Sequence, residues 1–419
     1  YMLKRDKVIC GIDLGSSKFK AVVSLVDGRG NFYRFEHVEA KNSGVRGGVV
    51  TDISKATLVL KQLIAKLENK INRKIKRVYV NIGGKDLVFR NANAVTPLTD
   101  RGNKVVTQAD INLVNSYARS LNVKLGEEII HDFAYRYILD DHNQVLNPKG
   151  LYGHKIAADL YLAVSSINHI ENIAKLINQA GLEIESLVFS GLASSLAVLD
   201  KKQKEEGCVL VDIGADLTHL LIFKDANLRF CDVLAYGGNN ITSGICDVLN
   251  LPRNLAEEIK DAYGSAISQD IDAEEEVMIK KDDSYQPIRR RVISSVIEPE
   301  VTQLLTRLKE KIDSSSYLSG RGYSVIITGG SSLLDGLLEL AESVLGVSVK
   351  LGIPKVEGFR GKNLLKSSNR AVGFASAIGL LHYGLDMTKS NKFTIFRSKD
   401  TNLLTYISAR LKGIYSDYF

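Results

Sequence analysis

The stretch ICGIDLGSSKFK, residues Ile9 to Lys20, is the part of the chain on which the fold depends. An apolar run ends at Asp13, and an alternating pattern resumes after Gly15, which predicts a strand, a tight turn and a second strand. Glycine at the turn lets backbone N–H groups approach a bound group closely, so that they could face one anion together with Ser16, Ser17 and Lys18. Asp13 could hold a hydrated magnesium ion beside that anion. An ordinary hairpin turn has the same composition, so one copy of the pattern does not decide between the two interpretations.

A second copy of the pattern occurs at Cys208 to Phe223, CVLVDIGADLTHLLIF, where an apolar strand again ends in Asp-aliphatic-Gly, at Asp212 to Gly214. A third glycine turn, SVIITGGSS at Ser324 to Ser332, leads into a helix expected at Leu333 to Leu345. A strand that runs through Gly-Gly into a helix N-terminus is suited to binding an anion or a nucleotide. The three turns together predict two related half-domains that face one nucleotide.

Bulk composition is that of an ordinary globular protein of more than one domain, with 419 residues, 45% hydrophobic and 25% charged. The four cysteines have no metal-binding spacing, and we expect them to be reduced. No run approaches 18 consecutive apolar residues, and the charged N-terminal stretch does not resemble a signal peptide. The net charge of +7 is mild and would suit an acidic partner or an anionic membrane.

Residues 87–166 differ from the two half-domains and predict an inserted small α/β module, with a helix that begins at Thr107 and has Asp110 three residues on. A later helix is expected from about Val292 to Ile312, and Pro299 should start it or kink it.

The end of the chain changes pattern after a polar stretch, Lys389 to Ser398, that we interpret as a linker. Apolar residues then recur at helical spacing, with basic residues beside them. Such a helix would lie in a membrane interface, apolar face down, although packing on the protein body is the commoner fate of amphipathic helices. The residues expected to contact the membrane are Leu403, Leu404, Ile407, Arg410, Leu411 and Ile414.

These motifs resemble the actin and heat-shock ATPase superfamily, and in detail the FtsA family of bacterial cell-division actin homologues. The resemblance is carried by GIDLGSSKFKAVV from Gly11, GVRGGVVTDI from Gly44, NPKGLYGHKIAADLYLAVSS from Asn147, GGNNITSGICDVLNLPRNLAEEIKDAYGSA from Gly237, VIEPEVTQLLTRLKEKI from Val296 and VIITGGSSLLDGLLELAESVLGVSVKLGIP from Val325. It covers nearly the whole chain and implies an α/β, actin-like, two-lobed ATPase fold with four subdomains, in which an inserted 1C-type subdomain replaces the usual 1B.

The resemblance also implies subdomain boundaries. They are 1–85 for the first part of 1A, 86–166 for the inserted 1C, 167–206 for the rest of 1A, 207–240 for the first part of 2A, 241–322 for 2B, 323–370 for the rest of 2A, 371–388 for a return helix to the first lobe, 389–401 for a linker and 402–419 for an amphipathic membrane-targeting helix.

ATP and Mg²⁺ are the implied cofactors, with Asp13 and Asp212 holding the metal through water. The implied nucleotide contacts are Gly15, Ser16, Ser17, Lys18, Gly214, Ala215, Asp216, Thr218, Gly237, Gly238, Glu257, Lys260, Gly329, Gly330 and Ser331. Without the resemblance, Glu257 and Lys260 would be interpreted as an exposed salt bridge one helical turn apart.

Four positions depart from the family pattern. Ala215 replaces a glycine, His219 replaces an aspartate, and Glu300 replaces a residue that is more often basic. Ser190, followed by Gly191, stands where relatives have an acidic or amide residue and then proline, at the position that orients the attacking water. Because serine is a poor base, we predict that ATP binds and that hydrolysis is slow or undetectable.

The family's function implies a protein that polymerises on the cytoplasmic face of the inner membrane at the division septum. It tethers filaments of FtsZ through the FtsZ C-terminal tail, and its inserted subdomain recruits later division proteins; no nucleic-acid partner is expected. Two alternatives stay open: a PilM-like scaffold of a type IV pilus system, and a kinase or chaperone ATPase of the superfamily. The FtsZ tail is expected to meet a basic stretch around one helix: Arg289, Arg290, Arg291, Arg307, Lys309 and Lys311.

Overall fold

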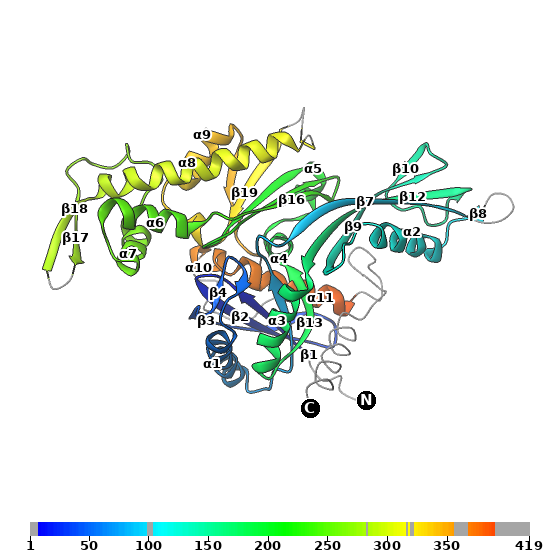
Figure 1. Cartoon of the computed structure of the whole chain (residues 1–419), viewed down its shortest axis with the longest axis horizontal. Coiled ribbons are helices and arrows are strands. Elements are labelled where there is room, and N and C mark those ends of the chain that lie inside the picture. Colours follow the sequence, from blue (N-terminus) through cyan, green and yellow to red (C-terminus); the bar gives the residue numbers. More distant parts are fainter. Residues whose placement is uncertain are drawn as a thin grey trace.

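The computed structural model describes residues 7–98, 104–281, 284–315, 317–318, 322–355 and 368–389. Two lobes, each built on a five-stranded sheet, face one another. Each lobe carries an extension, and the two extensions point in opposite directions (Figure 1).

The first lobe is built on a sheet with the strand order β13-β6-β1-β2-β3. β1 and β2 form the first predicted hairpin, and β6 and β13 run parallel to β1. Helices α1 and α3 pack against one face of this sheet, while α4 and α11 pack against the other. The bounds are β1 Lys7–Leu14, β2 Lys18–Val26, β3 Phe32–Lys41, β4 Val45–Arg46, β5 Val49–Val50, α1 Ile53–Ile71, β6 Arg77–Ile82, α3 Ile167–Gln179, β13 Glu183–Phe189, α4 Ser190–Val198 and α11 Ala375–Lys389.

The second lobe repeats this plan in a sheet with the order β16-β15-β14-β19-β20. β14 and β15 form the second predicted hairpin, and β19 lies parallel to β14 as β6 lies to β1. The hairpin turns therefore occupy equivalent places, because each follows the central strand of its sheet. The bounds are α5 Lys201–Glu206, β14 Cys208–Ile213, β15 Thr218–Lys224, β16 Asn227–Leu234, β19 Ser324–Thr328, η1 Gly330–Leu333, α9 Leu337–Leu345, β20 Val349–Leu351 and α10 Ser368–Val372.

Two sequence-based expectations for the second lobe need correction. The third glycine turn leads into the short 3₁₀ turn η1, and α9 begins only at Leu337, four residues later than expected. Of the two outcomes expected for Pro299, a helix start or a kink, the start is wrong, because α8 begins nine residues before Pro299 and continues past it. The first turns of α8 pack Ile293 and Ile297 into the core, which offsets the hydrogen bond that proline removes. The extension of this lobe consists of α6 Gly238–Leu249, α7 Arg253–Tyr263, β17 Glu276–Lys281, β18 Ser284–Arg289 and α8 Arg290–Ser314.

The extension of the first lobe is an inserted α/β domain with its own small core. Its helix α2 starts as predicted, with Thr107 and Asp110 forming a reciprocal capping box. A bidentate ion pair, Arg90 to Glu127 at 2.6 Å for both bonds, joins β7 to β9 and holds the pKa of Glu127 at about 2. The bounds are β7 Val88–Pro97, β8 Lys104–Val105, α2 Gln108–Ser120, β9 Glu127–Leu139, β10 Asn143–Val145, β11 Tyr152–Gly153 and β12 Lys155–Ser166, with the main sheet in the order β10-β9-β12-β7.

The expected linker and membrane-targeting helix lie outside the described residues, apart from Lys389 at the end of α11. Within the described ranges, none of the helices combines the length and the apolar character that crossing a bilayer requires.

Candidate functional site

A cleft of about 780 Å³ lies between the two lobes. Both hairpin turns, the third glycine turn, α7 and the residues leading into α11 line it, so segments more than 300 positions apart in sequence meet there. Among the sequence-predicted residues, the lining includes Asp13, Gly15, Ser16, Ser17, Lys18, Ser190, Asp212, Gly214, Ala215, Asp216, Gly238, Glu257, Lys260, Gly329, Gly330 and Ser331.

Asp13 stands at the end of β1 and is held by an asparagine that the sequence did not single out. The Asn81 side chain accepts a hydrogen bond from Leu14 N at 2.7 Å and donates one to Asp13 Oδ1 at 2.6 Å. It also donates to Ser190 Oγ at 3.1 Å, and Ser190 Oγ donates in turn to the carbonyl of Ile82 at 3.1 Å. The carboxylate and the serine are thereby fixed in place by the parallel strand next to β1.

Asp212 occupies the equivalent position in the second lobe and accepts a hydrogen bond from Ser194 Oγ at 2.5 Å. The backbone of Gly329 lies directly against the Asp212 side chain. Only glycine fits there, because a Cβ would lie 2.4 Å from Asp212 Oδ1, and the φ of +92° also favours glycine. The first glycine of the third turn is therefore required by the carboxylate beside it.

The two carboxylates create an electrostatic cost that a cation would relieve. Burial raises the pKa of Asp13 to about 6, with the nearby Asp212 adding to the rise and Lys20 opposing it. Within the described part of the chain, no three His, Cys, Asp or Glu side chains converge closely enough to hold a metal ion on their own. Magnesium usually keeps several water ligands and uses one or two carboxylates plus phosphate oxygens, so Asp13 and Asp212 suit that ion.

Backbone groups join the second hairpin turn to α6. Gly238 N donates to Gly214 O at 3.0 Å, and Ser331 Oγ donates to the same carbonyl at 2.9 Å. Asn239 N likewise donates to Ala215 O at 2.7 Å, so the first N–H groups of α6 hold the second hairpin turn in place where Gly238 and Asn239 line the cleft.

Three predicted nucleotide contacts are placed differently from expectation. The Thr218 hydroxyl is fully buried and donates to Tyr236 O, so it does not line the cleft. Gly237 is buried against the carbonyls of Gly214 and Ala215 and is not among the residues that line the cleft. Asp216 does line the cleft, but its carboxylate accepts from Gly47 N at 2.8 Å and from Asn239, so it joins the two lobes.

Glu257 and Lys260 both line the cleft from α7. Lys260 donates to Thr242 Oγ1 at 3.0 Å and pairs with Asp261 at 3.4 Å, and only 13% of its side chain is exposed. The alternative of an exposed salt bridge between Glu257 and Lys260 is therefore not what the structure contains.

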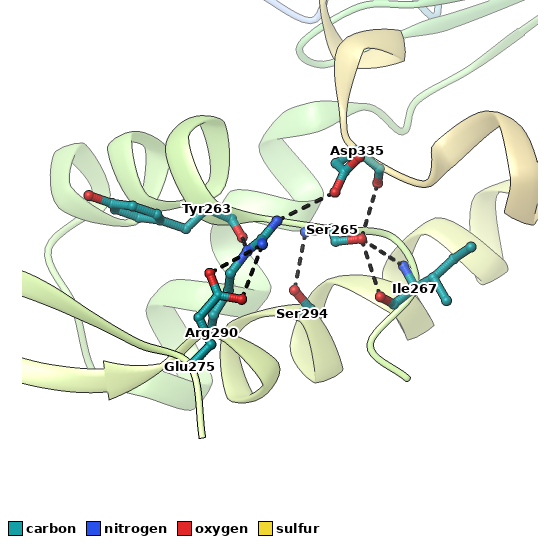
Figure 2. Close-up of polar contacts among 7 residues, drawn as sticks. All are labelled: Tyr263, Ser265, Ile267, Glu275, Arg290, Ser294 and Asp335. Carbon is teal, nitrogen blue, oxygen red and sulfur yellow. Dashed lines mark hydrogen bonds and ion pairs between the residues drawn. The ribbon is translucent and has the colours of Figure 1, made fainter. Parts of the chain in front are cut away.

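Arg290 was expected to face a partner protein, and the structure turns it toward the cleft. Figure 2 shows its guanidinium between three segments: Nε donates to Tyr263 O at 2.9 Å, Nη1 bonds Glu275 at 3.3 Å, and Nη2 pairs with Asp335 at 3.4 Å. Beside it, Ser265 N donates to Ser294 Oγ, and Ser265 Oγ contacts Ile267 and the carbonyl of Asp335. The end of α7, the start of α8 and the loop after η1 are thus fastened together at one edge of the cleft.

The remaining basic residues do not form one continuous surface. Arg289 pairs with Glu274 at 3.2 Å, and Arg291 donates to the carbonyls of Ile271 and Gln269. The other group begins at Arg307, 16 residues further along α8 than Arg291, which is roughly 24 Å at the helical rise per residue. There Arg307 lies over the Tyr236 ring, Lys309 donates to Val344 O and Lys311 pairs with Asp232. Each of these basic side chains already has a contact within the protein. This weakens the case for one acidic partner that binds all six basic residues together.

Several cleft residues were not predicted to have this role. His219, treated as a strand residue, is buried, and both ring nitrogens lack a hydrogen-bond partner among the described residues. Its ring lies edge-on to Phe189, and burial lowers its pKa while Asp212 opposes the shift. Lys20 bonds the Gly373 carbonyl and lies 5.3 Å from the Phe374 ring, which brings the residues before α11 into the cleft. Asn81 could have been singled out from the sequence, because it is a polar residue near the carboxyl end of a buried strand. No local sequence pattern identifies Gly373 or Phe374 as cleft residues.

Comparisons with known proteins agree with this arrangement. The family model for cell division protein FtsA matches residues 209–379, and the model for the SHS2 domain inserted in FtsA matches residues 84–164. The chain is 28% identical to cell division protein FtsA of Pseudomonas aeruginosa over 386 residues, 91% of this chain and 90% of that protein. It is 28% identical to the Escherichia coli K12 protein of the same name over 390 residues, 90% of each.

Solved structures confirm the predicted actin-like α/β fold. The PilM–PilN type IV pilus biogenesis complex has a chain that matches with a TM-score of 0.62 at 18% identity, covering 90% of this chain and 98% of that one. MreB5 of Spiroplasma citri, solved bound to ADP, matches with a TM-score of 0.51 at 12% identity, covering 92% and 99%. The two family models in their expected order, and relatives that match along nine-tenths of their length, show that this chain belongs to the FtsA family of cell-division actin homologues.

Proposed function

We propose that the chain binds Mg·ATP in the cleft and uses the bound nucleotide to hold its two lobes in an assembly-competent arrangement. The observation that carries this proposal is the pair of carboxylates, Asp13 and Asp212, at equivalent hairpin ends of two lobes that share one cleft. Burial is the main cause of the raised pKa of Asp13, and the nearby Asp212 carboxylate adds to it, so a cation between the two would favour their charged forms. Asp13 and Asp212 would hold a hydrated magnesium ion, whose positive charge would offset the negative charge of the carboxylates and of the phosphates.

The chain's own groups supply the rest of the site. Backbone N–H groups at the two hairpin turns are suited to phosphate oxygens, with Lys18 and Lys20 adding positive charge. Glu257 and Lys260 reach the other end of the cleft, where a ribose hydroxyl would find a carboxylate acceptor and an ammonium donor. Leu333 and Leu334 offer an apolar surface to the base.

Hydrolysis should be slow, because a serine, which is a poor base, stands at Ser190, where relatives have the residue that orients the attacking water. The Ser190 hydroxyl donates to Ile82 O and accepts from Asn81 Nδ2, so its proton and one of its acceptor sites are already used within the protein. Turnover below about 1 per second, the low end for phosphoryl-transfer enzymes, is expected.

Within cell division, the proposed role is to polymerise on the cytoplasmic face of the inner membrane at the septum and to tether FtsZ filaments there. The C-terminal residues Asn402 to Phe419 would supply the membrane anchor, since their sequence has an apolar stripe flanked by basic residues. The FtsZ tail would meet the second-lobe extension at Arg307 and Lys311, where the two cations lie one helical turn apart on α8. Later division proteins would bind the inserted domain.

Two measurements test the nucleotide proposal and the scaffold proposal separately. For the nucleotide site, Asp212→Asn should weaken Mg²⁺-dependent ATP binding by at least about tenfold, as expected when one charge partner of a bound cation is lost. Asp232→Asn is the matched control, because Asp232 lies in the same sheet but outside the cleft and pairs with Lys311. The proposed site would be contradicted if the affinity for ATP were the same with and without magnesium and the same in Asp212→Asn as in the parent.

For the scaffold, the full chain should form filaments on an anionic lipid monolayer with Mg·ATP, observed by electron microscopy. Isolated monomers under these conditions, with ATP binding intact, would argue against self-assembly while leaving the nucleotide site in place.

A further inference from the structure

A cluster of basic side chains covers the end of α1 and the turn that leads into β6. We call Lys66, Lys70, Arg73, Lys74, Lys76 and Arg77 the basic rim. All six are exposed. Between Lys66 and Arg77 the only acidic residue is Glu68, so this segment has a net charge of 6 − 1 = +5.

Neighbouring acids reduce this charge without removing it. Glu68 turns inward to Lys74 at 2.7 Å and to Ile75 N, with 14% of its side chain exposed. Glu185 pairs with Arg77 at 3.1 Å, and Glu183 is exposed on the same strand. Counting both of these glutamates leaves 5 − 2 = +3 on this part of the surface.

The basic rim lies at the end of the first-lobe sheet that is remote from the cleft. β1 and β6 are parallel, so Arg77 at the start of β6 is at the same end as Lys7, while Asp13 at the other end of β1 faces the cleft. α1 ends there too, since it leads into β6 through a short turn.

Helix α11 runs from the cleft to this same end. Its first residues, Ala375 and Ser376, line the cleft, whereas Gly384 lies against Ile9 and Tyr79 near the start of β1 and β6. α11 ends at Lys389, five residues beyond Gly384, so the part of the sequence that follows α11 is connected at the end that carries the basic rim. In Figure 1 this is the lower part of the first lobe, around α1 and β1.

We propose that the basic rim is a second membrane contact, which docks on the phosphate headgroups of an anionic lipid bilayer while the C-terminal segment inserts beside it. This inference rests on the proposed membrane association, because the C-terminal segment brings this end of the lobe to the lipid. Lysine and arginine near an anionic surface each strengthen binding, and the effect is lost in high salt. The contact also orients the body, with the cleft facing away from the membrane.

The composition of the basic rim favours a lipid surface over other polyanions. Residues 66–77 contain no aromatic side chain, so they offer no platform on which the bases of a single-stranded nucleic acid could stack. The apolar residues of the segment, Leu67, Ile71 and Ile75, are all buried in the core. The contact is therefore electrostatic and contributes no insertion of its own.

The test uses the full chain carrying Lys66→Gln, Lys70→Gln and Lys76→Gln together, which keeps helix propensity and removes three charges. The matched control carries Lys124→Gln, Lys149→Gln and Lys350→Gln, three exposed lysines elsewhere on the molecule. Both are sedimented with vesicles of phosphatidylcholine, with and without phosphatidylglycerol, at low and high salt. ATP affinity and thermal unfolding of each variant establish that the body is intact.

At low salt the rim variant should bind phosphatidylglycerol vesicles at least about tenfold more weakly than the parent, since each basic residue near the surface is worth roughly fivefold. The control variant should stay within about twofold of the parent, and high salt should remove the difference between rim variant and parent. Equal binding of rim variant and parent at low salt overturns the inference, and loss of binding by Leu411→Glu with Ile414→Glu would then leave the C-terminal anchor standing alone. A parent chain that binds no vesicles overturns both. A rim variant that loses affinity for duplex DNA but binds vesicles like the parent also overturns the lipid assignment.

Discussion

Ser190→Ala should lower stability but leave ATP turnover unchanged. In the folded chain the Ser190 hydroxyl accepts from Asn81 and donates to the Ile82 carbonyl, both at 3.1 Å, and the residue is only 4% exposed. Alanine leaves that carbonyl without its donor and removes one acceptor of the Asn81 amide, which still bonds Asp13. An unsatisfied buried group costs about 1–3 kcal/mol, so we expect the free energy of unfolding to fall by about 2 kcal/mol.

Turnover should respond differently, because the serine proton is already committed to a backbone carbonyl. A positioned acid or base contributes about 10²–10⁴ in rate, and the structure gives Ser190 no such role. Phosphate release by the alanine variant should therefore stay within about threefold of the parent, since no catalytic contribution is removed.

The assay is single-turnover phosphate release with Mg·ATP at saturating nucleotide, combined with denaturant unfolding. Ser195→Ala is the matched control: its hydroxyl lies in the same helix, is fully buried and donates to Leu192 O at 2.8 Å, away from the cleft. A tenfold slower release in Ser190→Ala, with ATP affinity and Ser195→Ala unchanged, would show that the serine takes part in hydrolysis. Parent turnover above about 1 per second would also refute the reasoning.

Three further predictions concern the inserted domain, the cleft edge and the tail. Glu127→Gln should lower the free energy of unfolding by about 2–3 kcal/mol at pH 7. Because the pKa of Glu127 in the folded chain is depressed to about 2, the stability that its charge contributes is complete above the ordinary pKa of 4.5 and is lost as the pH falls toward 2. A difference in denaturant unfolding between variant and parent that does not change with pH would contradict this prediction. Arg290→Gln should weaken ATP binding several-fold with little effect on an FtsZ tail peptide, while Arg307→Glu should do the reverse, and fluorescence titrations that give the opposite assignment would refute the placement of Arg290. Leu411→Glu with Ile414→Glu should abolish sedimentation with anionic liposomes and leave ATP binding intact, and continued pelleting or global unfolding would mean that the tail packs on the body.

Local patterns were sufficient for the repeated core of the fold. Alternating apolar residues on both sides of Asp13 and Asp212 predicted two hairpins, and the structure contains them as β1–β2 and β14–β15. The capping box at Thr107 could also be predicted, because its two residues, Thr107 and Asp110, lie within one helical turn of each other. These features depend on residues that are close together in the chain, and for that reason a single sequence was enough to predict them.

Features that depend on tertiary packing could not be read in this way. Pro299 was expected to start a helix or to kink it, but the burial of Ile293 and Ile297 holds the preceding turns in α8, so the helix begins nine residues earlier. The two glycines at Gly329 and Gly330 suggested an immediate helix start, whereas Gly329 is present because its backbone lies against Asp212. His219 could not be distinguished from an ordinary strand residue, since only the folded chain shows that it turns toward the cleft.

The run Arg289 to Arg291 illustrates how far composition can mislead, and what the correct placement implies. Three consecutive charges suggested one docking surface, yet the change from β18 to α8 between the first two sends them to different partners. Only Arg290 reaches the cleft, where it contacts the end of α7 and the loop after η1 (Figure 2). Because α7 also carries Glu257 and Lys260, a change in this wall would be transmitted to α8, the helix on which Arg307 and Lys311 lie. If the nucleotide and the FtsZ tail bind where we propose, they can influence one another through α8, provided that each binds one arrangement of that helix more tightly than another.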